Sequence, residues 1–177
     1  MIKKIKIFSF GLFLCWSSLG CGYSAQSLLP KHLRTIYVEP FKNSIDYTTE
    51  QTGNIYFPLL EVNVRNAIIN RYVFDGNLRI KEKDKAGLIL KGELIGYERD
   101  ALRVSDAEDV EEYRVRIIIK LVLWDTTQKE VFWQEDAFAG EASYFVSGPK
   151  IQTEKQALDA AVVDLARRVV ERTIENW

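Results

Sequence analysis

The sequence predicts a two-layer α+β domain, in which about four mostly antiparallel strands form one sheet and two helices pack on one of its faces. Two segments carry apolar residues at helical spacing, and a long segment between them alternates between apolar and other residues. The apolar share of 47% and the charged share of 28% are typical of a globular domain. Because two helices cover only one face of such a sheet, we expect the other face to be open or to bind a partner.

The first helix is predicted from about Tyr56 to Phe74. Pro58 is tolerated near its start, because the N–H groups of a first turn have no helical acceptor. Asp75-Gly76 is expected to end it, since glycine readily adopts the left-handed conformation. The apolar residues on its buried face are Phe57, Leu60, Val64, Ile68 and Tyr72.

The second helix is predicted from Thr153 to about Glu175. Thr153 and Gln156 have the spacing of a capping box, in which each side chain bonds the other residue's backbone N–H. Asp164 and Arg168 lie four residues apart and are expected to pair on its flank. The wide apolar arc of this helix suits packing on a sheet.

The strands are predicted from β-branched and aromatic residues and from alternation. Four are expected, at Arg34–Phe41, Ala86–Arg99, Glu112–Asp125 and Val131–Glu141, and Leu78–Ile80 is a candidate for a further short strand. In Glu112–Asp125, one apolar face holds Tyr113, Val115, Ile117, Ile119, Leu121 and Leu123. Loops are expected at 42–54, 100–112, 126–130 and 142–150; the last carries exposed-looking Tyr144, Phe145 and Val146, which either contact a partner or fold onto the core.

The segment 86–99 has a leucine side, formed by Leu88, Leu90 and Leu94. Strict alternation places Ile95 and Tyr97 on the opposite side. Gly92 and Gly96 fall on the leucine side, where glycine indicates a bend, a bulge or close approach by a helix.

The N-terminus has the form of an export signal. Three lysines precede a short apolar run at 7–16, and small residues lead to Cys21. The run is too short to span a bilayer comfortably, which favours a cleaved signal over an uncleaved anchor. Domain boundaries follow as a signal peptide at 1–20, a lipidated tether at 21–33 and a folded domain at 34–177.

The two cysteines support lipid attachment. Cys15 lies within the signal and leaves with it, so the mature chain keeps Cys21 alone and forms no internal disulfide. Leu19 and small residues before Cys21 resemble the lipobox of bacterial lipoproteins, with the order of Ser18 and Leu19 exchanged. Gly22, in place of the aspartate that retains such proteins in the inner membrane, favours the outer membrane.

The residues give little support for catalysis. His32 is the sole histidine and lies in the tether, and no phosphate-binding or nucleophile motif occurs. The acidic residues of 106–112 do not have the spacing of an EF-hand, so we expect a solvated loop rather than a calcium site. With 24 basic and 25 acidic residues, the chain has no charge excess that indicates nucleic acid. We therefore expect no enzyme, cofactor or metal.

A binding face is better supported. Alternation along 112–125 places Arg114, Arg116 and Lys120 on the face away from the helices, beside Ile118, Val122 and Trp124. Cations next to apolar side chains suit an amphiphile with anionic headgroups, and arginine matches phosphate geometry. The alternative is an ordinary solvated sheet face.

Residues 21–43, CGYSAQSLLPKHLRTIYVEPFKN, resemble the start of the lipopolysaccharide (LPS)-assembly lipoproteins of the LptE type. There a Cys-Gly-Tyr lipidation site leads through a Leu-Pro tether into a strand of the form T-I-x-V-x-P-F-x-N, which Thr35 to Asn43 match. The segments AGLILKGELIGYERD at 86–100 and LVLWDTTQKEVFW at 121–133 also fit.

The resemblance implies an outer-membrane lipoprotein that binds LPS, plugs the LptD β-barrel translocon and aids its assembly. Arg114, Arg116 and Lys120 come from strand alternation and are not carried over from the family. The alternative is a structural lipoprotein of another envelope or secretion complex, for example one that tethers the cell wall.

Overall fold

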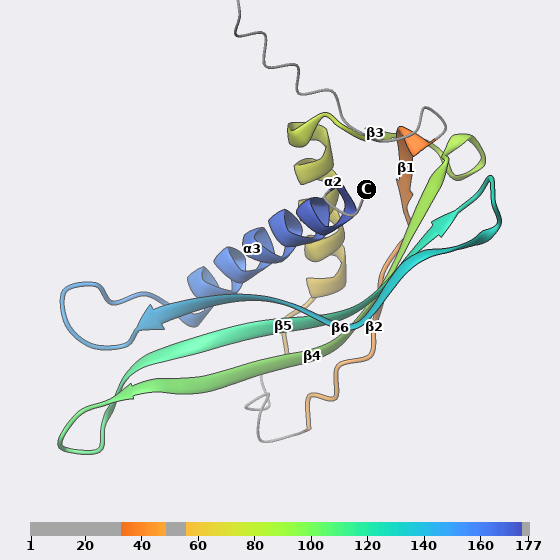
Figure 1. Cartoon of the computed structure of the whole chain (residues 1–177). Coiled ribbons are helices and arrows are strands. Elements are labelled where there is room, and N and C mark those ends of the chain that lie inside the picture. Colours follow the sequence, from red (N-terminus) through yellow and green to blue (C-terminus); the bar gives the residue numbers. More distant parts are fainter. Residues whose placement is uncertain (1–32, 49–55, 175–177) are drawn as a thin grey trace, which may run out of the picture.

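The structure is a computed structural model that describes residues 33–48 and 56–174 (Figure 1). Two helices lie against one side of a long, twisted sheet, as the sequence predicts. In chain order the elements are β1 (Thr35–Val38), β2 (Lys42–Asn43), α2 (Leu60–Asp75), β3 (Arg79–Ile80), the short 3₁₀ helix η3 (Lys83–Lys85), β4 (Leu88–Val104), β5 (Val110–Asp125), β6 (Glu130–Phe145) and α3 (Glu154–Ile174).

The sheet has six strands in the order β3-β1-β4-β5-β6, with β2 pairing β4 beside β1. The three long strands β4, β5 and β6 are antiparallel, whereas β1 runs parallel to both β3 and β4. The predicted fold class is confirmed, and its α2 crossover connects the parallel strands β1 and β3, as such pairs require.

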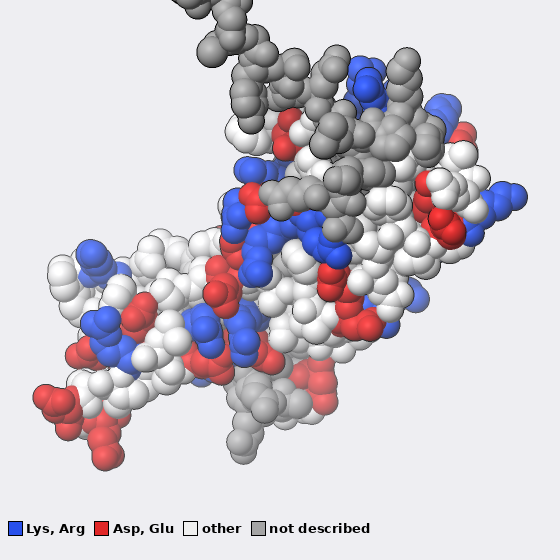
Figure 2. Space-filling view, in the orientation of Figure 1, with Lys and Arg blue, Asp and Glu red and all other residues white. Residues whose placement is uncertain are grey.

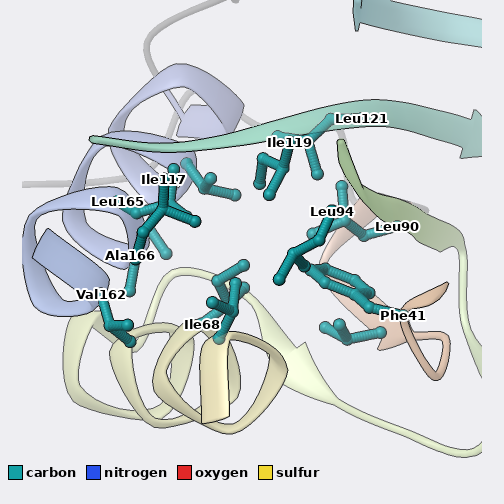
Figure 3. Packing of buried hydrophobic residues seen from close by; sticks show 14 of the residues in the cluster. Phe41, Ile68, Leu90, Leu94, Ile117, Ile119, Leu121, Val162, Leu165 and Ala166 are labelled. Carbon is teal, nitrogen blue, oxygen red and sulfur yellow. The ribbon is translucent and has the colours of Figure 1, made fainter. Parts of the chain in front are cut away.

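The core lies between the sheet and both helices (Figure 3). From Val115 to Leu123 every second residue of β5 is fully buried, which confirms the predicted alternation. Helix α2 contributes its predicted face to this core, through Leu60, Val64, Ile68 and Tyr72. The Tyr72 hydroxyl hydrogen-bonds the Thr173 hydroxyl of α3 at 2.8 Å, which joins the two helices inside the core.

The predicted helix ends are largely confirmed. Gly76 has φ 78°, and its N–H donates to the Tyr72 carbonyl. The Gln156 N–H donates to Thr153 Oγ1, while Thr153 N–H donates to the Gln156 side chain, so the capping box forms. Asp164 and Arg168 also pair, at 3.8 Å. Helix α2 begins at Leu60 rather than near Tyr56.

A β-bulge in β4 overturns one prediction. Leu94 pairs with Ile119 and Gly96 with Ile118, so Ile95 is an extra residue without its own partner. The extra residue reverses the alternation, and Tyr97 therefore points into the core instead of away from the leucines. The bulge confirms one of the meanings predicted for glycine in this strand.

Two glycines mark close approaches. A side chain at Gly92 would meet the ring of Phe41, from the loop after β1, rather than a helix. Helix approach occurs instead at Gly140, where an added Cβ would lie 2.6 Å from the Leu165 backbone nitrogen of α3. Gly140 therefore allows α3 to lie directly on β6.

Two predicted loops are strands for much of their length. β4 and β5 continue to a short turn at 105–109, so most of 100–112 is paired. β6 continues to Phe145, and Tyr144 is buried, which agrees with the second of its two predicted alternatives, packing onto the core. Both extensions lack the simple apolar alternation of β5.

Within the described residues, neither α2 nor α3 has the length and apolar character that a membrane-spanning helix needs.

Candidate ligand-binding face of the sheet

The sheet face opposite the helices, here called the open face, carries the cations predicted from the sequence. Arg114, Arg116 and Lys120 project from β5, and their side chains are 34%, 35% and 44% exposed. Their apolar neighbours on this face are half-buried: Ile118, Val122 and Trp124. The structure therefore brings these residues together on one strand face, as the alternation predicts.

The two arginines pair with two carboxylates from β4, one of which they share. Asp100 Oδ2 lies 3.5 Å from Arg114 Nη2 and 3.3 Å from Arg116 Nη2, and Glu98 pairs with Arg116. The register explains the pairing, because Glu98 lies opposite Arg116 and Asp100 opposite Arg114. The bulge at Ile95 is what brings both carboxylates to the open face. We call Glu98, Asp100, Arg114 and Arg116 the arginine cluster.

The arginine cluster does not satisfy both guanidinium groups. Asp100 serves two arginines at distances near the upper limit of a hydrogen bond. The Nε–H groups of Arg114 and Arg116 have no acceptor among the described residues. Both Nε atoms are buried, so a ligand with anionic oxygens that approaches from solvent meets the terminal Nη groups of these arginines rather than the Nε–H groups.

Lys120 lies nearer the other end of the same face. Its ammonium group pairs with Asp136 of β6 at 2.9 Å. The hydrogen bond and charge of Asp136 raise the pKa of Lys120, and the same contact, with a hydrogen bond from Gln134, lowers the pKa of Asp136. Lys120 is therefore cationic at neutral pH, and an incoming anion has to compete with one surface carboxylate.

A shallow depression of about 200 Å³ adjoins Lys120. It lies where β4 and β5 meet the chain that follows β1, and Lys91 beside it lies over the ring of Trp124 at 5.6 Å. Three lysines and two glutamates are among its lining residues, which are Glu39, Pro40, Lys42, Lys91, Gly92, Glu93, Lys120 and Val122. The depression extends the cationic and apolar character of the open face.

A second polar cluster, on the helix side, was not predicted. Glu154, in the first turn of α3, accepts hydrogen bonds from Tyr97 at 2.6 Å, Arg99 at 2.9 Å and Tyr144 at 3.4 Å. Burial, then the hydrogen bond and charge of Glu154, raise the pKa of Tyr97. The cluster fixes the start of α3 on the outer half of the sheet. Tyr97 lies on this side because of the bulge in β4, which no local sequence pattern predicts.

The acidic turn forms the end of the β4–β5 hairpin, at the lower left of Figures 1 and 2. Ser105 closes it by bonding the backbone of Asp109. Within the described residues, no group of three or more His, Cys, Asp or Glu could hold a metal ion. Cys21 and His32 lie outside the described residues.

Comparison with known proteins identifies the family. The sequence profile of the LptE family, described as lipopolysaccharide-assembly, matches residues 33–173. The chain belongs to the LptE family. This is a family of non-catalytic assembly lipoproteins. No curated protein sequence matches the chain significantly.

Solved structures share the fold at low sequence identity. A protein from Xanthomonas campestris has a TM-score of 0.52 and 11% identity, covering 80% of this chain and 84% of that one. A minor lipoprotein from Acinetobacter baumannii has a TM-score of 0.49 and 12% identity, over 81% and 94% of the two chains. For the rare lipoprotein B from Shewanella oneidensis the TM-score is 0.45 and the identity 14%, over 80% and 94%. At 11% identity, the likeness to the Xanthomonas campestris protein shows a shared fold alone.

Proposed function

We propose that this protein is an outer-membrane lipoprotein, processed after residue 20 and acylated at Cys21, whose folded domain begins near residue 34. In this role it binds LPS and plugs the LptD β-barrel during LPS transport to the cell surface. Membership of the LptE family is the observation that carries the proposal. Attachment of two or more acyl chains provides the stable membrane anchoring that one chain does not.

The open face is the proposed LPS-binding surface. Arg114 and Arg116 present forked donors to phosphate oxygens, and Lys120 adds a third cation along the same strand. Ile118, between Arg116 and Lys120, offers apolar contact for acyl chains. The helices leave this face uncovered, so a ligand reaches it without rearranging the core.

Binding at this face requires LPS phosphates to replace the carboxylates of the arginine cluster. A phosphate monoester carries more charge than a carboxylate and has three acceptor oxygens, so it competes with Glu98 and Asp100 for the guanidinium donors while the arginines keep their positions. The carboxylates also keep the free face soluble and hold the guanidinium groups in place. Removing a carboxylate should therefore strengthen LPS binding, whereas removing an arginine should weaken it.

Purified mature chain with Cys21→Ser tests this role, because LPS binding is then measured without the attached acyl chains. The Arg114→Gln, Arg116→Gln double variant should bind LPS about tenfold more weakly, since each charge-assisted hydrogen bond contributes roughly 1.5–3 kcal/mol before competition. Asp100→Asn should bind more tightly. Glutamine is used because glutamate would add charge beside Glu98 and destabilise the strand pair.

Arg167→Gln is the matched control. Arg167 is also an exposed arginine held by two carboxylates, Asp164 and Glu171, but it lies on α3. Its loss should leave LPS affinity unchanged. Equal affinity in the control and in the double variant would remove the open face from the proposal. Failure of the native lipoprotein to co-purify with a large β-barrel protein would contradict the plug role.

A further inference from the structure

At one end of the domain, the chain enters the fold close to exposed apolar side chains. Leu33, the first described residue, is buried, and the Arg34 carbonyl accepts a hydrogen bond from Arg79 N–H at the start of β3. Helix α2 ends beside this pair, so its last turn lies at the same end of the molecule, at the top of Figure 1. We call the surface formed by Arg34, the last turn of α2 and residues 76–85 the entry end.

Helix α2 exposes apolar side chains at the entry end. Phe74 is 81% exposed and Val73 is 66% exposed, and neither belongs to the buried core. The ring of Phe74 is touched by the guanidinium of Arg71 at 5.4 Å. An exposed aromatic ring with an adjacent cation is typical of a surface that rests in the interfacial region of a membrane.

The entry end is also basic, although the whole chain has a net charge of −1. Arg34 and residues 71–85 include six basic and three acidic side chains. Exposed Arg34, Arg79 and Lys81 form no ion pair with any residue in 33–48 or 56–174. Each such cation near an anionic membrane surface contributes about 1 kcal/mol of attraction.

At the opposite end of the molecule, the tip of the β4–β5 hairpin is acidic. Residues 105–112, at and beside the β4–β5 turn, contain five acidic residues and no basic one. β5 has 16 residues, which at about 3.3 Å each separate its two ends by roughly 50 Å. An anionic surface therefore attracts the entry end and repels the hairpin end, so the charges define one orientation.

We propose that the entry end docks on a lipid surface with anionic headgroups, with Phe74 and Val73 inserted and Arg34, Arg79 and Lys81 at headgroup level. Cys21 precedes Leu33 by 12 positions, so an extended tether spans at most about 40 Å. This reach lets the domain contact the membrane to which the tether is attached, but does not by itself orient it. The docked orientation directs the β4–β5 hairpin away from the membrane surface.

This inference rests on the proposed function for the membrane to which the chain is anchored. Its test uses a chain without lipid, so that a failure of docking can be distinguished from a failure of the proposed anchoring. Mature chain with Cys21→Ser is mixed with vesicles of phosphatidylethanolamine and phosphatidylglycerol, or of phosphatidylcholine alone. We expect binding to the anionic vesicles that falls as salt rises. Val73→Ser with Phe74→Ser should weaken it about tenfold, through loss of apolar burial. Val163→Ser is the matched control, because Val163 on α3 is also 66% exposed.

A second measurement tests the orientation. The Cys21→Ser mature chain contains no cysteine, so a single cysteine carries a polarity-sensitive dye. Dye at Val73→Cys should shift to the blue on anionic vesicles, and dye at Ile151→Cys, near the hairpin end, should not. Absence of vesicle binding, a shift at Ile151 instead of Val73, or equal loss in the serine control would overturn the proposal. The proposal would also be overturned if the chain formed a concentration-dependent dimer that the Val73→Ser, Phe74→Ser variant did not form, and if vesicles bound neither protein.

Discussion

Substitution of Gly140 by alanine tests how closely α3 lies on the sheet. The added Cβ would lie 2.4 Å from Leu165 Cβ and 2.6 Å from both the Cα and the nitrogen of Leu165. Favourable carbon contacts are about 3.5 Å or longer, so α3 has to retreat by roughly 1 Å. Two of the three obstructing atoms are backbone, so no side-chain rotation relieves the overlap.

The expected cost follows from these distances. Overpacking of this kind destabilises by about 1–3 kcal/mol, and a backbone obstacle places Gly140→Ala near the upper limit. Alanine also restricts the unfolded chain more than glycine does, which stabilises the folded state by about 0.4–1 kcal/mol. The net decrease in the free energy of unfolding is therefore about 2 kcal/mol. For a domain of this size, that loss lowers the Tm by roughly 4–8 °C.

Thermal and denaturant unfolding of the mature chain measure this loss. Gly96→Ala is the control, because its added Cβ would meet the flexible end of Ile118 at 3.2 Å on the open face. We expect that variant to remain within about 0.5 kcal/mol of the parent protein. If Gly140→Ala were as stable as Gly96→Ala, the account of α3 packing would be refuted.

Three further predictions concern the anchor, the titration of buried tyrosines and the start of α3. Cys21→Ser should release the protein from membranes into a high-salt wash, as seen by fractionation; persistent attachment would show another anchor. Burial raises the pKa of Tyr72 and Tyr97 above 10.0, so the stability that depends on their neutral forms is complete below pH 10 and is lost as the pH rises further. Denaturant unfolding at roughly pH 9 and pH 11 should show this loss, and phenylalanine at both positions should reduce it. Glu154→Gln should destabilise by about 1–2 kcal/mol, because Arg99 loses its partner, and hydrogen exchange should rise in the first turns of α3; unchanged exchange would contradict that role.

Much of the fold follows from local patterns in the sequence. The alternation of β5 survives folding because both of its neighbours are strands, so its odd residues face the core and its even residues the open face. Helix α3 carries its own capping signal in Thr153 and Gln156, and its predicted bounds are close to those observed. These elements were predictable because the determining residues lie close together in the sequence.

The remaining features depend on partners distant in the sequence. Neither Ile95 nor its neighbours reveal that β4 gains an extra residue at that point, so strict alternation predicts the wrong face for Gly96 and Tyr97. Tyr144 is buried by Glu154 and by stacking on Tyr113, contacts that local apolar spacing does not encode. The closeness of Gly140 to Leu165 likewise arises only once β6 and α3 have packed.

The arginine cluster was predictable only in part: its arginines follow from local alternation, whereas its carboxylates depend on the structure. Strand alternation places Arg114 and Arg116 on the open face, and the structure agrees. Their carboxylate partners could not be predicted, because only the bulge at Ile95 turns Glu98 and Asp100 toward them. The sequence therefore indicates where cations lie, whereas the structure shows what an anionic ligand has to displace.

Photo-crosslinking in growing cells tests most directly the claim that the open face contacts LPS. A photoreactive amino acid at Ile118 lies between Arg116 and Lys120, and one at Val163 lies on the exposed side of α3. We predict LPS adducts from position 118 and none from position 163. Equal adducts from both positions, or none from position 118 in cells that actively export LPS, would contradict the account.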